Sequence, residues 1–267
     1  MSCRAFAKEG RRRCARTWSS LAGLTLLIGG CVSSPYLAES LSEWKAAAPP
    51  PEDDLLYRIY LIGDSGYPRL DGPDPILTWL EARFKAESEN SAAVYLGDNI
   101  YPKGLPESDD PLYAESLARI NKQLDALKDF RGRIVFIPGN HDWDKSGQSG
   151  LWALNRQEDH IEAYLNRGNT FLPDDGFPGP SVVELTEDLV LVAIDTEWWL
   201  HDFERPIGDT GDYNLEVEED FLIEFDDVMR EYEGKRVIVA AHHSMYSNGE
   251  HAGFMSLKHH LFPLTKF

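Results

Sequence analysis

Four apolar runs, each ending in a turn that carries oxygen or nitrogen ligands, constrain what this chain can fold into. One of them, Ile134–Ile137, leads through Pro138-Gly139 into Asn140. Short apolar runs rich in β-branched residues are typical of buried parallel strands. Open α/β sheets bind their ligands in the loops at the carboxyl ends of such strands. One run of this kind is common, but its repetition predicts a site.

The same pattern recurs three more times along the chain. Tyr57–Ile62 precedes Asp64, Ala93–Leu96 precedes Asp98, and Val237–Ala241 precedes His242. Carboxylate and amide oxygens combined with an imidazole suit iron, manganese or zinc rather than a metal that prefers thiolates. Two such ions close together would hold a phosphoryl oxygen and lower the pKa of a water towards neutral pH. The loops therefore predict a metal site at one edge of a sheet.

Helical spacing of apolar residues predicts helices between these strands. The expected helices span Asp74–Glu89, Leu112–Phe130, Asn155–Asn166, Glu216–Tyr232 and a helix-like Met255–Leu264, and two further strands span Val182–Leu185 and Leu189–Ile194. Asp74-Pro75 is typical of a helix start, with a capping side chain and a first-turn proline. A hairpin within an otherwise alternating pattern favours two packed sheets with helices outside.

The amino terminus is typical of an export signal. Six basic residues precede Leu21–Ile28, an apolar stretch too short to cross a bilayer comfortably. Gly29-Gly30-Cys31 follows, and this end resembles a bacterial lipoprotein signal that is cleaved after Gly30 and lipidated on Cys31. The alternative is a short uncleaved anchor. Both predict an exported protein held in the cell envelope, in the periplasm or at the surface, and we expect the outer membrane.

The division of the chain follows from this reading. We expect residues 1–30 to be the signal peptide, 31–54 a tether, and 55–267 one domain that is incomplete at its carboxyl end. Beyond Cys31 there is no cysteine, so no disulfide framework is expected. Of 26 basic and 45 acidic residues the signal holds six and one, which leaves 20 and 44 and a formal charge of −24. This charge argues against nucleic acid as a partner, and an anionic substrate needs local positive charge, most simply from metals.

Together the four loops, in this order and spacing, resemble the calcineurin-like metallophosphoesterase superfamily. The resemblance covers roughly Leu55 to Phe267 and implies a four-layer α/β/β/α sandwich with two mixed sheets. The common first motif of the superfamily is Asp-x-His, whereas residue 66 of this chain is Gly. Tyr101, three residues after Asp98, stands where purple acid phosphatases place a metal-binding tyrosinate. The alternative for Tyr101 is a ring packed over the following turn.

The resemblance implies a role for each loop residue. Asp64 and Tyr101 would bind a first metal, Asp98 would bridge two metals, and Asn140 and His242 would bind the second. A phenolate favours a hard trivalent ion, so the implied cofactor is a dinuclear centre with Fe(III) first and divalent iron, zinc or manganese second.

Two histidines are candidate catalytic residues. His141 follows a ligand and is placed to contact phosphate or to protonate the leaving oxygen. His251 occupies a position similar to a second active-site histidine of the small purple acid phosphatases. We expect Asp142 to orient its neighbours rather than to bind metal, and His243 to be a packing or orienting residue.

One departure from the superfamily concerns its last motif, Gly-His-x-His, which gives one imidazole to each metal. The sequence reaches Phe267 before any such motif, and His259-His260 has neither its spacing nor its strand context. We expect the sequence to be a fragment that stops before this loop. The alternative is a protein that binds metal with two ligands fewer.

The sequence thus predicts a metal-dependent phosphoric ester hydrolase, in the first place an acid phosphatase-like enzyme for small phosphomonoesters. A phosphodiesterase or nucleotidase using the same site is the nearest alternative. A non-catalytic surface lipoprotein that keeps the fold is a second one, although five of the seven expected ligands are present. A third is an envelope interaction module that uses Trp198-Trp199 as an exposed anchor, whereas the simpler interpretation of these rings is a buried cluster. The oligomeric state is not predicted.

Overall fold

Two stacked sheets with helices on their outer faces make up the part of the chain that the structure, a computed structural model, describes. The described residues are 51–209, 214–215 and 217–244. The predicted export signal, most of the tether, His251 and the predicted helix Met255–Leu264 lie outside them. Within the described residues no helix is both long and apolar enough to span a membrane.

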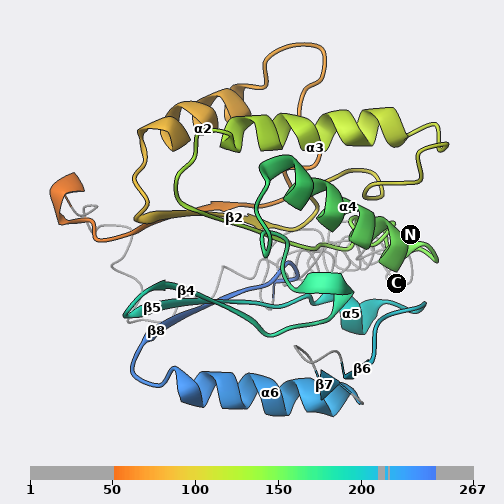
Figure 1. The fold of residues 1–267 in the computed structure, drawn as a ribbon. Helices are drawn as coiled ribbons and strands as arrows, with labels where there is room; N and C mark the ends of the chain where they lie inside the picture. The colour runs from red at the N-terminus through yellow and green to blue at the C-terminus, as the bar shows by residue number, and fades with distance from the viewer. Residues whose placement is uncertain (1–50, 210–213, 216, 245–267) are drawn as a thin grey trace, which may run out of the picture. The chain divides into compact units, whose positions relative to one another are not determined.

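The first sheet contains three parallel strands in chain order. They are β1 (Arg58–Ile62), β2 (Ser91–Leu96) and β3 (Arg133–Ile137). Register pairs Tyr60 with Ala93, and Val94 with Val135. Helices α2 (Pro75–Ala86), α3 (Tyr113–Leu127) and α4 (Gly150–Leu165) cover one face of this sheet (Figure 1).

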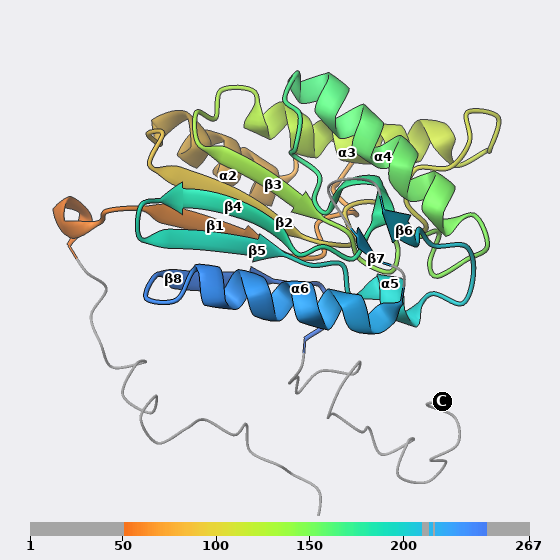
Figure 2. The ribbon, with the colours of Figure 1, turned by 60° about the horizontal axis from the view of Figure 1, so that its bottom comes forward.

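The second sheet is mixed. Its strands are β4 (Ser181–Thr186), β5 (Leu189–Ala193) and β8 (Arg236–Ala240), in the order β4-β5-β8. β4 pairs antiparallel with β5, as the predicted hairpin requires, and β5 pairs parallel with β8. Helix α6 (Glu218–Glu231) covers its outer face, and the short helix α5 (Glu197–Leu200) lies at the same end as β6 (Gly208–Asp209) and β7 (Asn214–Leu215) (Figure 2). Two 3-10 turns, η2 (Glu52–Asp54) and η3 (Asp174–Gly176), complete the described elements.

Side-chain alternation along β2 explains why the layers form. Ala93 and Tyr95 face the helices, in one apolar cluster with Phe84. Ala92 and Val94 face the second sheet, in another cluster. Because successive strand residues point to opposite faces, a strand that is apolar throughout must be covered on both sides. The four-layer α/β/β/α sandwich predicted from the sequence is therefore the observed fold.

The helix boundaries match the sequence pattern at one helix and miss it at another. Helix α2 begins as predicted, because the Asp74 carboxylate accepts hydrogen bonds from the backbone N–H groups of Ile76 at 2.9 Å and Leu77 at 3.1 Å. Helix α4 begins at Gly150, five residues before the predicted Asn155. A Cβ at Gly150 would lie 2.6 Å from His201 Cε1, so close packing requires glycine here. Because glycine is a poor helix former, the sequence pattern does not indicate that the helix begins at this residue.

Candidate metal centre

The carboxyl ends of β1 and β2 bring the first three predicted ligands together. The hydroxyl oxygen of Tyr101 lies 2.7 Å from Asp98 Oδ2 and 3.0 Å from Asp64 Oδ1. Both aspartates have positive φ, 53° for Asp64 and 54° for Asp98, in the left-handed region that non-glycine residues seldom adopt. Such conformations persist where surrounding structure enforces them, and they cluster at functional sites.

The other two predicted ligands, Asn140 and His242, meet on the opposite side of Asp98. His242 Nε2 lies 3.3 Å from Asn140 Oδ1 and 3.4 Å from Asp98 Oδ1. Its Nδ1 lies 2.8 Å from the carbonyl oxygen of Leu96, so we assign the ring proton to Nδ1 as the donor to that carbonyl. The Nε2 lone pair then faces Asn140 and Asp98, which is the orientation of a metal-binding imidazole.

Glycines leave room for this arrangement. A Cβ at Gly139 would lie 2.5 Å from Asp98 Oδ1, and a Cβ at Gly97 would lie 2.5 Å from His242 Nδ1. Neither position tolerates a side chain without displacing a predicted ligand. The oxygen and nitrogen donors and the space kept around them fit a pair of hard or borderline metal ions.

The phenol and the amide extend the donor set. Residues 51–209, 214–215 and 217–244 contain no cluster of three or more His, Cys, Asp or Glu side chains suited to holding a metal ion. The hydroxyl of Tyr101 lies beside Asp64 and Asp98, and the amide oxygen of Asn140 lies beside His242. Burial, and then hydrogen bonding and charge from Asp98, raise the pKa of Tyr101, so a cation is needed to make it a phenolate.

The predicted catalytic residue His141 faces the same group. Its Nε2 lies 3.9 Å from Asp98 Oδ2, and its backbone N–H donates to Asp98 Oδ1 at 3.0 Å. Its Nδ1 lies 2.5 Å from the carbonyl oxygen of Pro102, so we assign the ring proton to Nδ1 and leave Nε2 directed at the site. The second predicted catalytic residue, His251, lies outside the described residues.

Asp142 joins the loops after β2 and β3 through hydrogen bonds to its buried carboxylate. Its buried carboxylate accepts hydrogen bonds from the backbone N–H groups of Gly139 at 2.8 Å, Asn99 at 3.0 Å and Ile100 at 3.2 Å. The side-chain amide of Gln157 donates to it at 3.0 Å. Burial raises its pKa to about 6. These contacts are those of an orienting residue, as expected from the sequence.

Sequence reasoning missed a further pair of residues near the site. The indole Nε1 of Trp143 donates to Asp195 Oδ2 at 2.7 Å, and both side chains are fully buried. Burial raises the pKa of Asp195 to about 8. A signal was present, because Asp195-Thr196 follows the apolar run of β5 as the other loops follow theirs. It was overlooked because no superfamily motif begins there.

The interaction module with an exposed tryptophan anchor is contradicted by the structure. Trp198 is fully buried, and Arg205 lies over its ring at 4.1 Å. Trp199 is half-buried, with its ring centroid 4.5 Å from that of Phe221. His201, which directly follows α5, is also buried. These rings fill the space between α5 and α6, so the buried cluster is the correct interpretation.

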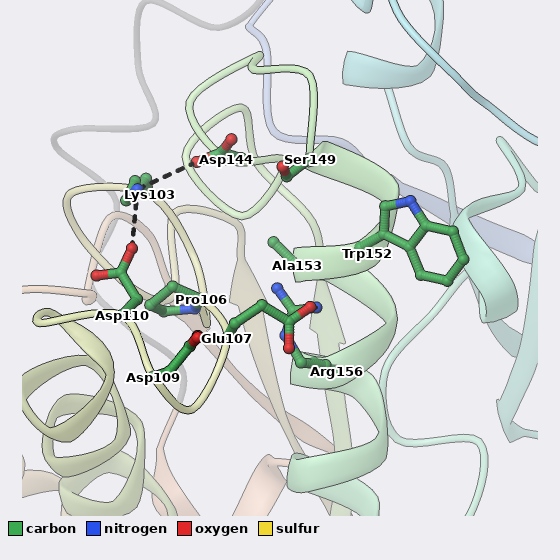
Figure 3. A pocket seen from close by; sticks show the side chains of 10 residues that line it. All are labelled: Lys103, Pro106, Glu107, Asp109, Asp110, Asp144, Ser149, Trp152, Ala153 and Arg156. Atoms are coloured by element: carbon green, nitrogen blue, oxygen red, sulfur yellow. Dashed lines mark hydrogen bonds and ion pairs between the residues drawn. The ribbon is translucent and has the colours of Figure 1, made fainter.

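A cavity of about 330 Å³ opens beside the loop that follows Tyr101. It is lined by Lys103, Pro106, Glu107, Asp109, Asp110, Asp144, Ser149, Trp152, Ala153 and Arg156 (Figure 3). Lys103 Nζ lies 3.4 Å from Asp110 and 3.9 Å from Asp144, and Arg156 pairs with Glu107 at 2.6 Å. Four carboxylates thus face two cations, so this wall does not by itself attract an anion.

This fold and these ligands define an α/β/β/α metal-dependent hydrolase. A model of the calcineurin-like phosphoesterase family matches residues 57–264, and the chain belongs to this family. It is also similar to purple acid phosphatase 17 of Arabidopsis thaliana, with 22% identity over 248 residues that cover 93% of this chain and 69% of the relative. Membership makes the protein a phosphoester hydrolase and implies a dinuclear metal centre.

Proposed function

We propose that this protein is an acid phosphatase-like enzyme that hydrolyses small phosphomonoesters with an Fe(III)–M(II) pair, where M is iron, zinc or manganese. The observation that carries the proposal is the phenol of Tyr101 held between Asp64 and Asp98. A phenolate at this place favours Fe(III). Residue 66 is Gly, so the chain lacks the metal-binding histidine of the common Asp-x-His motif. The similarity to a purple acid phosphatase supports the same assignment.

In this proposal Asp64 and Tyr101 would hold the first metal, Asn140 and His242 would hold the second, and Asp98 would be a ligand of both. When bound, the metals would supply an activated water and neutralise charge on the phosphoryl oxygens. His141 takes up a second proton from solvent on Nε2 while its Nδ1–H stays hydrogen-bonded to the Pro102 carbonyl, and it donates the Nε2 proton to the leaving alkoxide. We also assign His251 to this step, on the resemblance to the small purple acid phosphatases alone.

The test is the metal content and visible spectrum of the full-length protein, together with its substrate preference. We expect two metals per chain, one of them iron, and a tyrosinate-to-iron band that is lost in Tyr101→Phe. Phenyl phosphate should be hydrolysed faster than bis(4-nitrophenyl) phosphate. Two metals without the band would indicate a colourless zinc or manganese enzyme instead of an iron enzyme. A preference for the diester would identify a phosphodiesterase. A protein without stoichiometric metal would be a non-catalytic relative.

We further propose that the protein is exported and anchored by lipid on Cys31. The basic residues, the short apolar stretch Leu21–Ile28 and Gly29-Gly30-Cys31 support this proposal. Labelling with a radioactive fatty acid should mark the parent protein and spare Cys31→Ser. Equal labelling of both proteins would contradict the lipid site.

A further inference from the structure

The segment Asp195–Glu197, called here the bridging segment, lies between the loops that carry Asn140 and His242. It follows β5, which is the parallel neighbour of β8 and pairs Ala193 with Ala240. The backbone N–H of Ile194 continues this ladder by donating to the Ala240 carbonyl at 3.0 Å. The residues after the two strands therefore leave the sheet side by side. Nothing in the proposed reaction uses the bridging segment.

One contact of the bridging segment reaches the loop after β3. Asp195 Oδ2 accepts the Trp143 indole N–H at 2.7 Å, while Asp195 Oδ1 accepts the backbone N–H of Glu197 at 2.8 Å. Trp143 stands three residues after Asn140 and is fully buried. A buried hydrogen bond of this kind is costly to break, because the indole N–H of Trp143 and the Asp195 carboxylate would each lose a partner away from water. Asp195 therefore fixes the position of the loop that carries Asn140.

A second contact reaches the loop after β8. Thr196 Oγ1 accepts the backbone N–H of His243 at 3.2 Å and lies 2.8 Å from His243 Nδ1. Since the hydroxyl oxygen already accepts that N–H, its own proton is free to be donated to Nδ1, and we assign the ring proton to Nε2. His243 Nε2 then faces the buried carboxylate of Glu197, with Oε2 at 3.7 Å. One threonine thus fixes both the backbone and the ring of the residue next to His242.

We propose that Thr196 is a positioning residue for the second metal. Through His243 it sets the direction of His242, while its neighbour Asp195 sets the loop of Asn140. These are the two ligands assigned to the second metal alone, so this inference rests on the proposed function. Asp64 and Tyr101 leave the first sheet from β1 and β2 and are held by other contacts. Loss of the Thr196 hydroxyl should therefore weaken the second metal selectively.

The experiment compares Thr196→Val, which removes the hydroxyl, with Thr196→Ser, which keeps it. Zinc or manganese is titrated calorimetrically into the full-length protein that already holds one iron, and the tyrosinate band reports on the first metal. We expect Thr196→Val to weaken the second metal roughly 10- to 100-fold and to leave the band in place, since partners of metal ligands have effects of this size. Thr196→Ser should stay within about threefold of the parent.

Two results would overturn the proposal: unchanged zinc or manganese affinity in Thr196→Val, or equal weakening at both metals. His243→Ala removes the ring that contacts the Thr196 hydroxyl and keeps the backbone contact. Its side chain is 35% exposed, so this variant serves if Thr196→Val does not fold. It should weaken the second metal selectively, and an unchanged second site would again contradict the proposal. A parent protein that binds no metal would overturn the proposed function, whereas a two-metal parent indifferent to Thr196→Val would overturn the positioning role alone.

Discussion

The two proposed metal positions hold their ligands by different means. At the first position, backbone contacts join the loops of Asp64 and Tyr101, because the N–H of Gly66 donates to the Asp98 carbonyl at 2.9 Å and the N–H of Tyr101 donates to the Gly66 carbonyl at 3.0 Å. At the second position, side chains that follow β5 contact the loops of Asn140 and His242, through Asp195 and Thr196. Each of these side-chain contacts can be removed by a single substitution.

This difference gives a physical reason for the departure from Asp-x-His. A Cβ at Gly66 would lie 2.5 Å from the Asp98 carbonyl oxygen and 2.6 Å from the Ile100 nitrogen. The two loops are too close for any side chain at this position. With the histidine excluded, Tyr101 from the neighbouring loop is the group that reaches the space between Asp64 and Asp98.

The largest effect is expected for Gly66→Ala. Because the added methyl meets backbone atoms that cannot move away, the loops after β1 and β2 must separate. We expect a loss of about 3 kcal/mol in the free energy of unfolding, at the upper end of overpacking effects, and loss of the first metal. Urea unfolding and metal analysis measure the two changes.

Gly63→Ala is the matched control, since no atom lies within 4 Å of a Cβ added there and the two glycines belong to the same turn. It should behave like the parent. If Gly66→Ala also kept parental stability and both metals, the loops of Asp64 and Tyr101 would not be fixed by backbone packing. The contrast between the two metal positions would then disappear.

A smaller effect is expected for Asp142→Asn, which tests the joint between the loops after β2 and β3. The new amide group places N–H donors against the N–H groups of Gly139 and Asn99 that now donate to the carboxylate. Leaving buried donors without acceptors should cost about 2 kcal/mol of unfolding free energy. The partly exposed Asp144 provides the control variant Asp144→Asn, with an expected change below about 0.5 kcal/mol. Equal stabilities of the two variants in urea would show that the joint contributes nothing.

One contribution to the pH dependence of stability is expected from a carboxyl group outside the loops of the site. Burial raises the pKa of Glu158 in α4 to about 8 from an ordinary value of 4.5. Its contribution to stability is therefore fully present below about pH 4.5 and is lost as the pH rises through 8. Glu158→Gln should unfold like the parent at pH 4 and be more stable by roughly 1 to 2 kcal/mol at pH 9. Thermal unfolding at both pH values checks this, and parallel curves for the two proteins would contradict it.

The smallest effect is expected for Lys103, which lines the cavity beside the loop that follows Tyr101. Lys103→Gln removes one of two cations from a wall with four carboxylates, so a phosphate dianion should meet more repulsion. We expect KM for phenyl phosphate to rise about threefold at low salt, with the difference shrinking as ions screen the charges. Lys85→Gln, which changes an exposed lysine of α2 paired with Glu81, is the control. A salt-independent change, or one shared by both variants, would argue against a role for this charge.

The fold and the loops that carry Asp64, Asp98 and Tyr101 were largely predictable from the sequence, because the patterns that indicate them span only a few residues. The apolar runs, the Asp74 cap and the spacing of Asp98 and Tyr101 all act over a few residues. A strand that is apolar on both faces needs two covering layers, so the four-layer fold follows from such patterns. Asp64, Asp98, Tyr101 and Asn140 lie together because the parallel strands β1, β2 and β3 end at one edge, whereas His242 comes from β8 of the other sheet.

Only the tertiary structure decided how the loops of Asn140 and His242 are held. The Thr196–His243 and Trp143–Asp195 contacts join residues 47 and 52 positions apart, and no local pattern pairs them. The same holds for Gly150, whose place in α4 depends on His201, and for Trp198, whose burial depends on α6. The sequence therefore determined which groups reach the site, because strand ends are local. The packing between sheets determined how firmly each group is held, because its partners come from distant segments.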